Sequence, residues 1–150
     1  MSEILKFPST IGDILESEGV KAAYKALDSL DDRYKKTKML CLADVAESVL
    51  HIYEQKHSND SRVRNCIKGV RDYCNNKISE EELNKLRERT AFVASNAAVF
   101  AVYEVFASAD IAVCAACAAV HAAVCASVCA SWANINSQWV KNEEILSRYL

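Results

Sequence analysis

A row of cysteines with one histidine is the first feature of the sequence whose residue types could bind a metal ion. Residues 111–133 read IAVCAACAAVHAAVCASVCASWA. At about 100° per residue, one helix face of this stretch would carry Cys114, Cys117, His121, Cys125 and Cys129. One straight helix cannot converge four such ligands on one ion, because successive members climb about 5 Å per turn. We therefore predict no metal site: the cysteines should act as small hydrophobic residues, and His121 remains a candidate binding residue.

Two arginines near the middle of the chain are stronger candidates for binding an acidic partner or an anionic ligand. Arg62 and Arg64 fall in the first turn of a predicted helix, where the helix dipole disfavours cations. Their guanidinium groups could fork onto carboxylates or phosphates, while Tyr53 or Tyr73 could stack on a base. Alternatively, an arginine could pair inside the fold and lock a corner between helices. The candidate carboxylates for such a pair are Glu54, Asp60 and Glu104.

The remaining charged residues are weaker signals. Arg64, Lys68 and Arg71 follow at i, i+4 and i+7 and predict a solvated basic face. Glu104 and Asp110 are the only formally charged residues in an alanine-rich region, so each must be paired, exposed or shifted in pKa. A structural pairing is the simpler interpretation. No phosphate loop, nucleophile motif or zinc-ligand spacing occurs, so we predict neither catalytic residues nor a cofactor.

The composition is that of one globular domain over 1–150 without a general affinity for polyanions. The formal net charge is −2 and the isoelectric point is near 5.9, which gives no general attraction to nucleic acid or anionic lipid. The chain has seven cysteines, an odd number, and its start lacks a signal-peptide pattern. Both features favour reduced thiols and a cytoplasmic protein.

Apolar periodicity predicts an all-α chain, because three glycines and one proline leave strands few places to turn. The predicted segments, about seven helices in all, cover roughly 9–19, 20–27, 30–56, 62–74, 80–106, 110–133 and 136–150. Two of them have a clear apolar face: the third with Met39, Leu42, Ala43, Ala46, Val49, Leu50 and Tyr53, and the fourth with Val63, Cys66, Ile67, Val70, Tyr73 and Cys74. The predicted caps are Ser9 or Thr10, Ser29 with Asp32, Asp60 or Ser61, Ser79 with Glu82, and Ser108 or Asp110. HSND at 57–60 predicts a turn, and the asparagine pair at 75–76 can take the left-handed conformation.

The alanine-rich segment should form the centre of the molecule. Of the 43 residues in 91–133, 17 are alanine, which lets helix backbones approach closely. Residues 111–133 could span about 34 Å as a helix, enough for a bilayer. However, alanine, cysteine and serine favour membrane insertion less than leucine or phenylalanine do. We therefore predict a compact bundle around a central alanine-rich antiparallel hairpin. Short helices within 1–32 should precede the bundle. A C-terminal helix should complete it, with Trp139, Leu146 and Tyr149 facing the core.

One block of residues combines the arginine-containing turn with flanking aromatics and the alanine-rich segment. In chain order it contains Tyr53, Glu54, Asp60, Arg62, Arg64, Ile67 and Tyr73. This order is similar to that of the immunity proteins of the Imm-5-like family, small alanine-rich helical proteins of bacteria and phages, in which the turn reads D-x-R-P-R. Here Val63 replaces the usual proline, which loosens the turn but leaves the arginines. The resemblance covers about residues 38–133, within a family-like core over 33–133.

The resemblance implies a non-enzymatic immunity or counter-defence protein that binds and neutralises a toxin or a defence protein. The arginines leave an alternative open, a helical sponge that sequesters an anionic small molecule such as a nucleotide immune signal. Neither hypothesis involves a nucleic acid polymer or a membrane, and both are compatible with a homo-oligomer. If the protein is phage-encoded, as the resemblance allows, its place of action is the host cytoplasm. An enzyme using Glu104, Asp110 or His121 lacks an assembled set of groups. The candidate ligand- or partner-binding residues are Arg62, Arg64, Asp60, Glu54, Tyr53, Tyr73, Glu104 and His121.

Overall fold

The computed structural model describes residues 4–91 and 132–150, and every regular element in these ranges is helical. The α-helices are α1 (Ser9–Glu18), α2 (Val20–Ala26), α3 (Lys35–Lys56), α4 (Arg62–Cys74), α5 (Glu80–Ala91) and α8 (Trp132–Ser147). Two short 3-10 helices, η1 (Leu27–Ser29) and η2 (Asp32–Tyr34), connect α2 to α3. The predicted all-α class is confirmed for this part of the chain. The predicted alanine-rich hairpin, its Ser108 or Asp110 cap and the seven-helix total lie outside the described residues.

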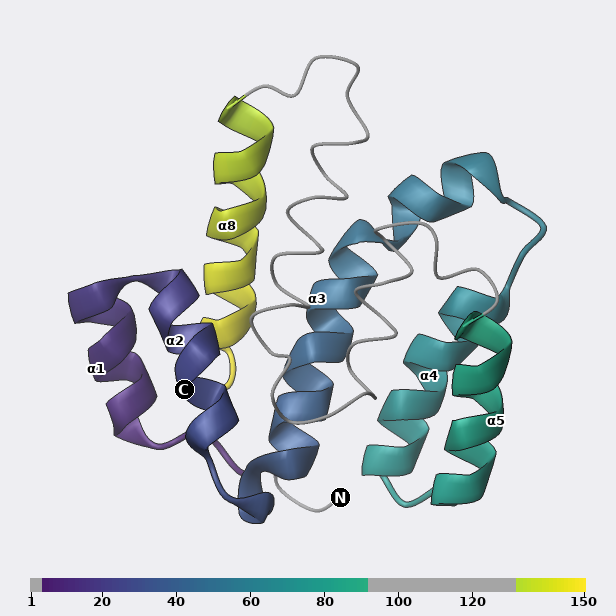
Figure 1. Ribbon diagram of the computed structural model, residues 1–150, viewed down its shortest axis with the longest axis horizontal. Helices are drawn as coiled ribbons and strands as arrows, with labels where there is room; N and C mark the ends of the chain where they lie inside the picture. Colours follow the sequence, from purple (N-terminus) through teal and green to yellow (C-terminus); the bar gives the residue numbers. More distant parts are fainter. Residues whose placement is uncertain (1–3, 92–131) are drawn as a thin grey trace.

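Helix α3 is the central element of the described part. It packs against α4 on one side and against α8 on the other. Figure 1 shows α1, α2 and α8 to the left of α3, with α4 and α5 to its right. Helix α1 packs on α2 and α5 packs on α4, so these two helices form the outer members of the arrangement. A long helix in this position can hold polar side chains toward both groups of neighbours.

The hydrophobic core follows the apolar pattern of the sequence. On α4 the buried residues include Val63, Cys66, Ile67 and Val70, which is the predicted face. On α3 the buried set is wider than one stripe, since Cys41 and Val45 are buried as well as the predicted positions. The predicted α3 positions that are buried are Met39, Leu42, Ala43, Ala46 and Leu50. Helix α3 is covered on more than one side because it lies between two groups of helices.

Two of the predicted helix starts are wrong in detail. Ser9 and Thr10 lie inside the first turn of α1, where Pro8 is the preceding residue and no side chain caps the helix. Pro8 fixes the entry direction and its carbonyl accepts the N–H of Ile11 at 3.0 Å. Ser29 ends η1, its hydroxyl donating to the carbonyl of Ala26. No capping box forms there. Instead, the Asp31 side chain accepts a hydrogen bond from the Arg33 amide at the start of η2.

Other predicted boundaries are confirmed. Asn76 has φ of 58°, the left-handed conformation expected of the asparagine pair. Ser79 and Glu82 form a reciprocal capping box at the start of α5: the Ser79 amide donates to Oε2 of Glu82 at 2.8 Å, and the Glu82 amide donates to Oγ of Ser79 at 3.2 Å. Helix α8 begins at Trp132 rather than near residue 136 and ends at Ser147. The core contacts predicted for the C-terminal helix and the residues after it hold, since Leu146 is fully buried and Trp139 and Tyr149 pack against the core.

The cysteines that the structure describes behave as small hydrophobic residues. Cys41, Cys66 and Cys74 are buried and none forms a disulfide. The other four cysteines of the chain belong to the predicted stripe at 114–129, which lies outside the described ranges. Among the helices of residues 4–91 and 132–150, none has both the length and the apolar character required to cross a bilayer.

Candidate partner-binding site

The turn between α3 and α4 brings together four of the sequence-predicted site residues. We call this region, residues 54–64, the α3–α4 corner; its candidate residues are Glu54, Asp60, Arg62 and Arg64. The chain reverses at 57–60, where the Asp60 amide donates to the carbonyl of His57 at 3.0 Å. Helix α4 then returns alongside α3. This reversal places the last turns of α3 beside the first turns of α4.

Arg62 is held by the residue two positions before it. Its Nε donates to Oδ1 of Asp60 at 2.9 Å and its Nη2 donates to Oδ2 at 2.7 Å, while the Arg62 amide donates to Oδ1 at 3.1 Å. The same three bonds recur between Arg33 and Asp31 at the start of η2. This Asp-x-Arg clamp is therefore a local device for starting a helical segment, in which one carboxylate binds both the backbone and the side chain of the arginine.

Arg64 makes the pair that joins the two helices of the corner. Its Nε and Nη2 donate to the two carboxylate oxygens of Glu54 at 2.9 and 2.5 Å. The hydrogen bond from Arg64 holds the pKa of the Glu54 carboxyl below its ordinary value, and the Glu54 carboxylate raises the pKa of Arg64. Two of the three pairings considered from sequence are thus present, with Asp60 and with Glu54.

Of the other predicted site residues, Tyr73 lies away from these two arginines. Tyr73 lies in the last turn of α4, about 14 Å along the helix from Arg64, and packs partly buried against the core. Tyr53 belongs to α3 close to the corner. Glu104 and His121, together with Asp110, lie outside the described residues.

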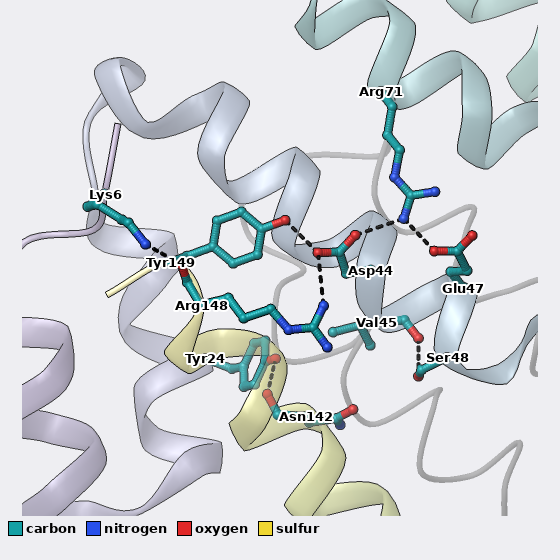
Figure 2. A network of polar contacts seen from close by, with 10 residues as sticks. All are labelled: Lys6, Tyr24, Asp44, Val45, Glu47, Ser48, Arg71, Asn142, Arg148 and Tyr149. Atoms are coloured by element: carbon teal, nitrogen blue, oxygen red, sulfur yellow. Dashed lines mark hydrogen bonds and ion pairs between the residues drawn. The ribbon is translucent and has the colours of Figure 1, made fainter. Parts of the chain in front are cut away.

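A second polar group, which the sequence analysis did not identify, is centred on Asp44 of α3. We call it the Asp44 cluster; its members are Asp44, Glu47, Arg71, Arg148 and Tyr149. Nη2 of Arg71 donates to Oδ1 of Asp44 and to Oε2 of Glu47, both at 2.7 Å. Oδ2 of Asp44 accepts from the Tyr149 hydroxyl at 2.5 Å and lies 3.9 Å from Nη1 of Arg148. Figure 2 shows the Asp44 carboxylate between α4 and the C-terminal residues.

The Asp44 cluster corrects the interpretation of Arg71 as part of a solvated basic face. The Arg71 side chain is half-buried between α3 and α4 rather than directed into water. Burial acts to lower the pKa of this guanidinium, but hydrogen bonds to Glu47 and Asp44 outweigh it and raise the pKa. A sequence signal for this cluster existed: Asp44 lies between Ala43 and Val45 on a predicted core helix, where an unpaired carboxylate would be costly.

The Cys41 and Cys74 thiols and the Tyr24 phenol have raised pKa values, so each stays protonated near neutral pH and is a poor nucleophile. Burial raises the pKa of Cys41, and it raises the pKa of Cys74 to about 11. Burial also raises the pKa of Tyr24, whose hydroxyl donates to the carbonyl of Asn142 in α8 at 2.6 Å. In residues 4–91 and 132–150 no three His, Cys, Asp or Glu side chains are grouped so that they could hold a metal ion. The charged side chains of the α3–α4 corner can instead bind and orient charged groups of a partner.

Comparisons with known proteins give no relative. No family model matches the sequence, and neither the curated proteins nor the solved structures contain a match to it.

Proposed function

We propose that the protein is a non-enzymatic immunity or counter-defence protein that binds a partner protein through the α3–α4 corner and neutralises it. The observation that supports this proposal most is the pair of bidentate ion pairs, Arg62 with Asp60 and Arg64 with Glu54, both formed at the exposed α3–α4 corner. Residues of this corner also carry the resemblance to Imm-5-like immunity proteins. We place this activity in the cytoplasm, in keeping with described cysteines that form no disulfide.

Preformed ion pairs favour a protein partner over a small anion. Each corner arginine already uses Nε and Nη2 on a carboxylate, so a phosphate group would have to displace that carboxylate to be bound bidentately. A protein surface can instead contact cations and carboxylates together, since interfaces match charge patterns of both signs. Holding both side chains in place before association also reduces the entropy lost on binding.

Native mass spectrometry of the protein purified gently from a host lysate tests this proposal. We expect the wild-type chain to carry a second protein that is absent from the Arg62→Ala/Arg64→Ala double variant. Arg33→Ala removes an equivalent Asp-x-Arg clamp at η2, so this matched control should retain the partner. Co-expression of the captured protein with each variant then measures neutralisation directly.

The alternative outcomes are equally specific. A bound mass of a few hundred daltons that is lost only in the double variant would replace the proposal with the sponge hypothesis, in which the arginines hold an anionic small molecule. A partner retained by the double variant, or lost equally in Arg33→Ala, would remove the α3–α4 corner from the binding site.

A further inference from the structure

The side of α4 that faces away from the hydrophobic core carries exposed polar residues. We call it the outer face of α4; its exposed members are Ser61, Arg62, Arg64, Asn65 and Lys68. The opposite side of the helix packs its apolar residues into the core. Lys68 pairs with Asp72 one turn further along, so each of the three cations on this face has a carboxylate partner.

In all three pairs the cation projects further into solvent than the carboxylate. Side-chain exposure is 43% for Arg62 against 18% for Asp60, and 59% for Arg64 against 28% for Glu54. For Lys68 and Asp72 the values are 72% and 18%. The neighbouring helix α5 has the opposite order, with Lys85 at 62% and Glu81 at 81%. The outer face of α4 is therefore close to neutral in total charge, but an approaching molecule meets its positive groups first.

Arg64 also keeps part of its hydrogen-bonding capacity. In the described structure its side-chain hydrogen bonds are made by Nε and Nη2, both to Glu54. Nη1 carries two further N–H donors on the other edge of the planar guanidinium. Lys68, four residues later, lies about 6 Å further along the helix axis. Alternate residues of an extended chain are spaced by about 7 Å, so two acidic side chains of such a chain could meet both cations.

We infer that the outer face of α4 docks an acidic segment of the partner protein, with carboxylates contacting Arg64 and Lys68. The inference rests on the proposed function for the existence of a partner, and it adds the charge of the partner surface. A nucleic acid fits less well. The carboxylates paired with these cations would repel a continuous phosphate backbone, in which every unit carries a charge.

A peptide-binding measurement tests this face without the natural partner. The probe is a fluorescein-labelled ten-residue peptide in which glutamate alternates with serine, titrated at low salt and followed by fluorescence anisotropy. We expect Arg64→Gln and Lys68→Gln each to weaken binding about two- to fivefold, the range typical of single exposed charges. Lys85→Gln makes the same charge change on α5 and should have no effect. Asp72→Asn should tighten binding, because it removes the negative charge behind Lys68, and a merely structural role of the pair would not produce tighter binding.

Several results would overturn the inference. These are no binding by the wild-type protein, equal weakening by Lys85→Gln, or unchanged binding in both Arg64→Gln and Lys68→Gln. Tighter binding of a labelled oligothymidine with the same variant pattern would assign the face to nucleic acid instead. Thermal unfolding of each variant verifies that it is folded. If Arg64→Gln does not fold, the separate variants Lys68→Gln and Asp72→Asn still test the inference.

The two proposals can fail separately. Peptide binding that follows the expected variant pattern, together with no captured protein in native mass spectrometry, would reject the proposed function and retain the acidic-segment site. A captured partner that is lost in the double arginine variant, together with no peptide binding, would retain the proposed function and reject the acidic-segment site.

Discussion

The hydroxyl of Tyr149 donates a hydrogen bond of 2.5 Å to Oδ2 of Asp44, a residue 105 positions earlier in the chain. The other oxygen of the same carboxylate accepts from Arg71 of α4. The backbone carbonyl of Tyr149 accepts the amide of Phe7 at 2.7 Å, and the ammonium of Lys6 donates to the neighbouring carbonyl of Arg148. The residues before α1 and after α8 are therefore fixed to each other and to the middle of α3.

Replacing Tyr149 with phenylalanine should remove this link while keeping the ring. We expect the free energy of unfolding to fall by about 1–2 kcal/mol, because Asp44 loses a donor in a partly buried site. For a chain of this length that is a decrease of roughly 2–8 °C in melting temperature, measured by circular dichroism. Tyr34→Phe is the control: Tyr34 also contacts Phe7, but in the described part of the chain its hydroxyl makes no hydrogen bond. Equal melting temperatures for both variants would contradict the role of the hydroxyl.

Gly69 and Gly12 should respond in opposite directions to alanine. A Cβ on Gly69 would lie 2.4 Å from Cδ1 of Leu86 in α5, so this leucine would have to move. We expect Gly69→Ala to destabilise by about 1–3 kcal/mol, as overpacking does. A Cβ on Gly12 meets only Cδ1 of Leu150 at 3.9 Å, so Gly12→Ala should stabilise by up to about 1 kcal/mol through helix propensity.

A second substitution separates crowding from other causes at Gly69. Leu86→Val removes one methylene where Gly69→Ala adds a methyl group, so the double variant should recover part of the lost stability in urea unfolding. Strictly additive losses would show that contact with Leu86 is not the reason for the glycine.

Ser79 should contribute more to the free energy of unfolding than Ser9, the other serine at a helix start. Ser79→Ala removes half of the capping box of α5, and we expect a loss of about 1 kcal/mol in the free energy of unfolding. Ser9→Ala should cost little, because Ser9 lies inside α1 and caps nothing. Urea unfolding of the two variants side by side decides this, and an equal loss for both would show that the sequence-predicted cap at Ser9 contributes after all.

The ion pair between Glu54 and Arg64 should make stability depend on acid pH. The pKa of Glu54 is lower in the folded protein than its ordinary value of 4.5, so the unfolded chain binds more protons in that range. The stabilisation is complete above about pH 4.5 and is lost as the pH falls through the lowered folded value. Arg64→Gln should flatten the dependence of the unfolding free energy on pH below the ordinary Glu54 value of 4.5.

A double-variant comparison isolates this effect from other carboxylates. In a Glu54→Gln background the titrating group is absent, so adding Arg64→Gln should not change the slope further. A further change of slope would assign the acid dependence to a different partner of Arg64.

Local interactions of the corner were accessible from sequence, whereas the partners of Asp44 were not. The pairing of Arg62 with Asp60 depends on residues two positions apart, and that of Arg64 with Glu54 spans ten residues across one predicted turn. By contrast, Asp44 binds Arg71 and Tyr149, whose proximity requires the packing of α4 and of the C-terminal residues on α3. No periodicity in one helix specifies which residue of another helix lies opposite.

The sequence by itself determined the helical class, the buried face of α4, the left-handed Asn76 and the capping box of α5. These features follow from backbone preferences and from apolar spacing within a few turns, which act before any tertiary contact exists. Only the tertiary structure decided that Arg71 is half-buried beside Asp44 and that Arg62, Arg64 and Lys68 project beyond their carboxylates. Burial and exposure of a charged side chain depend on which helices pack around it, and that information is not local in the chain.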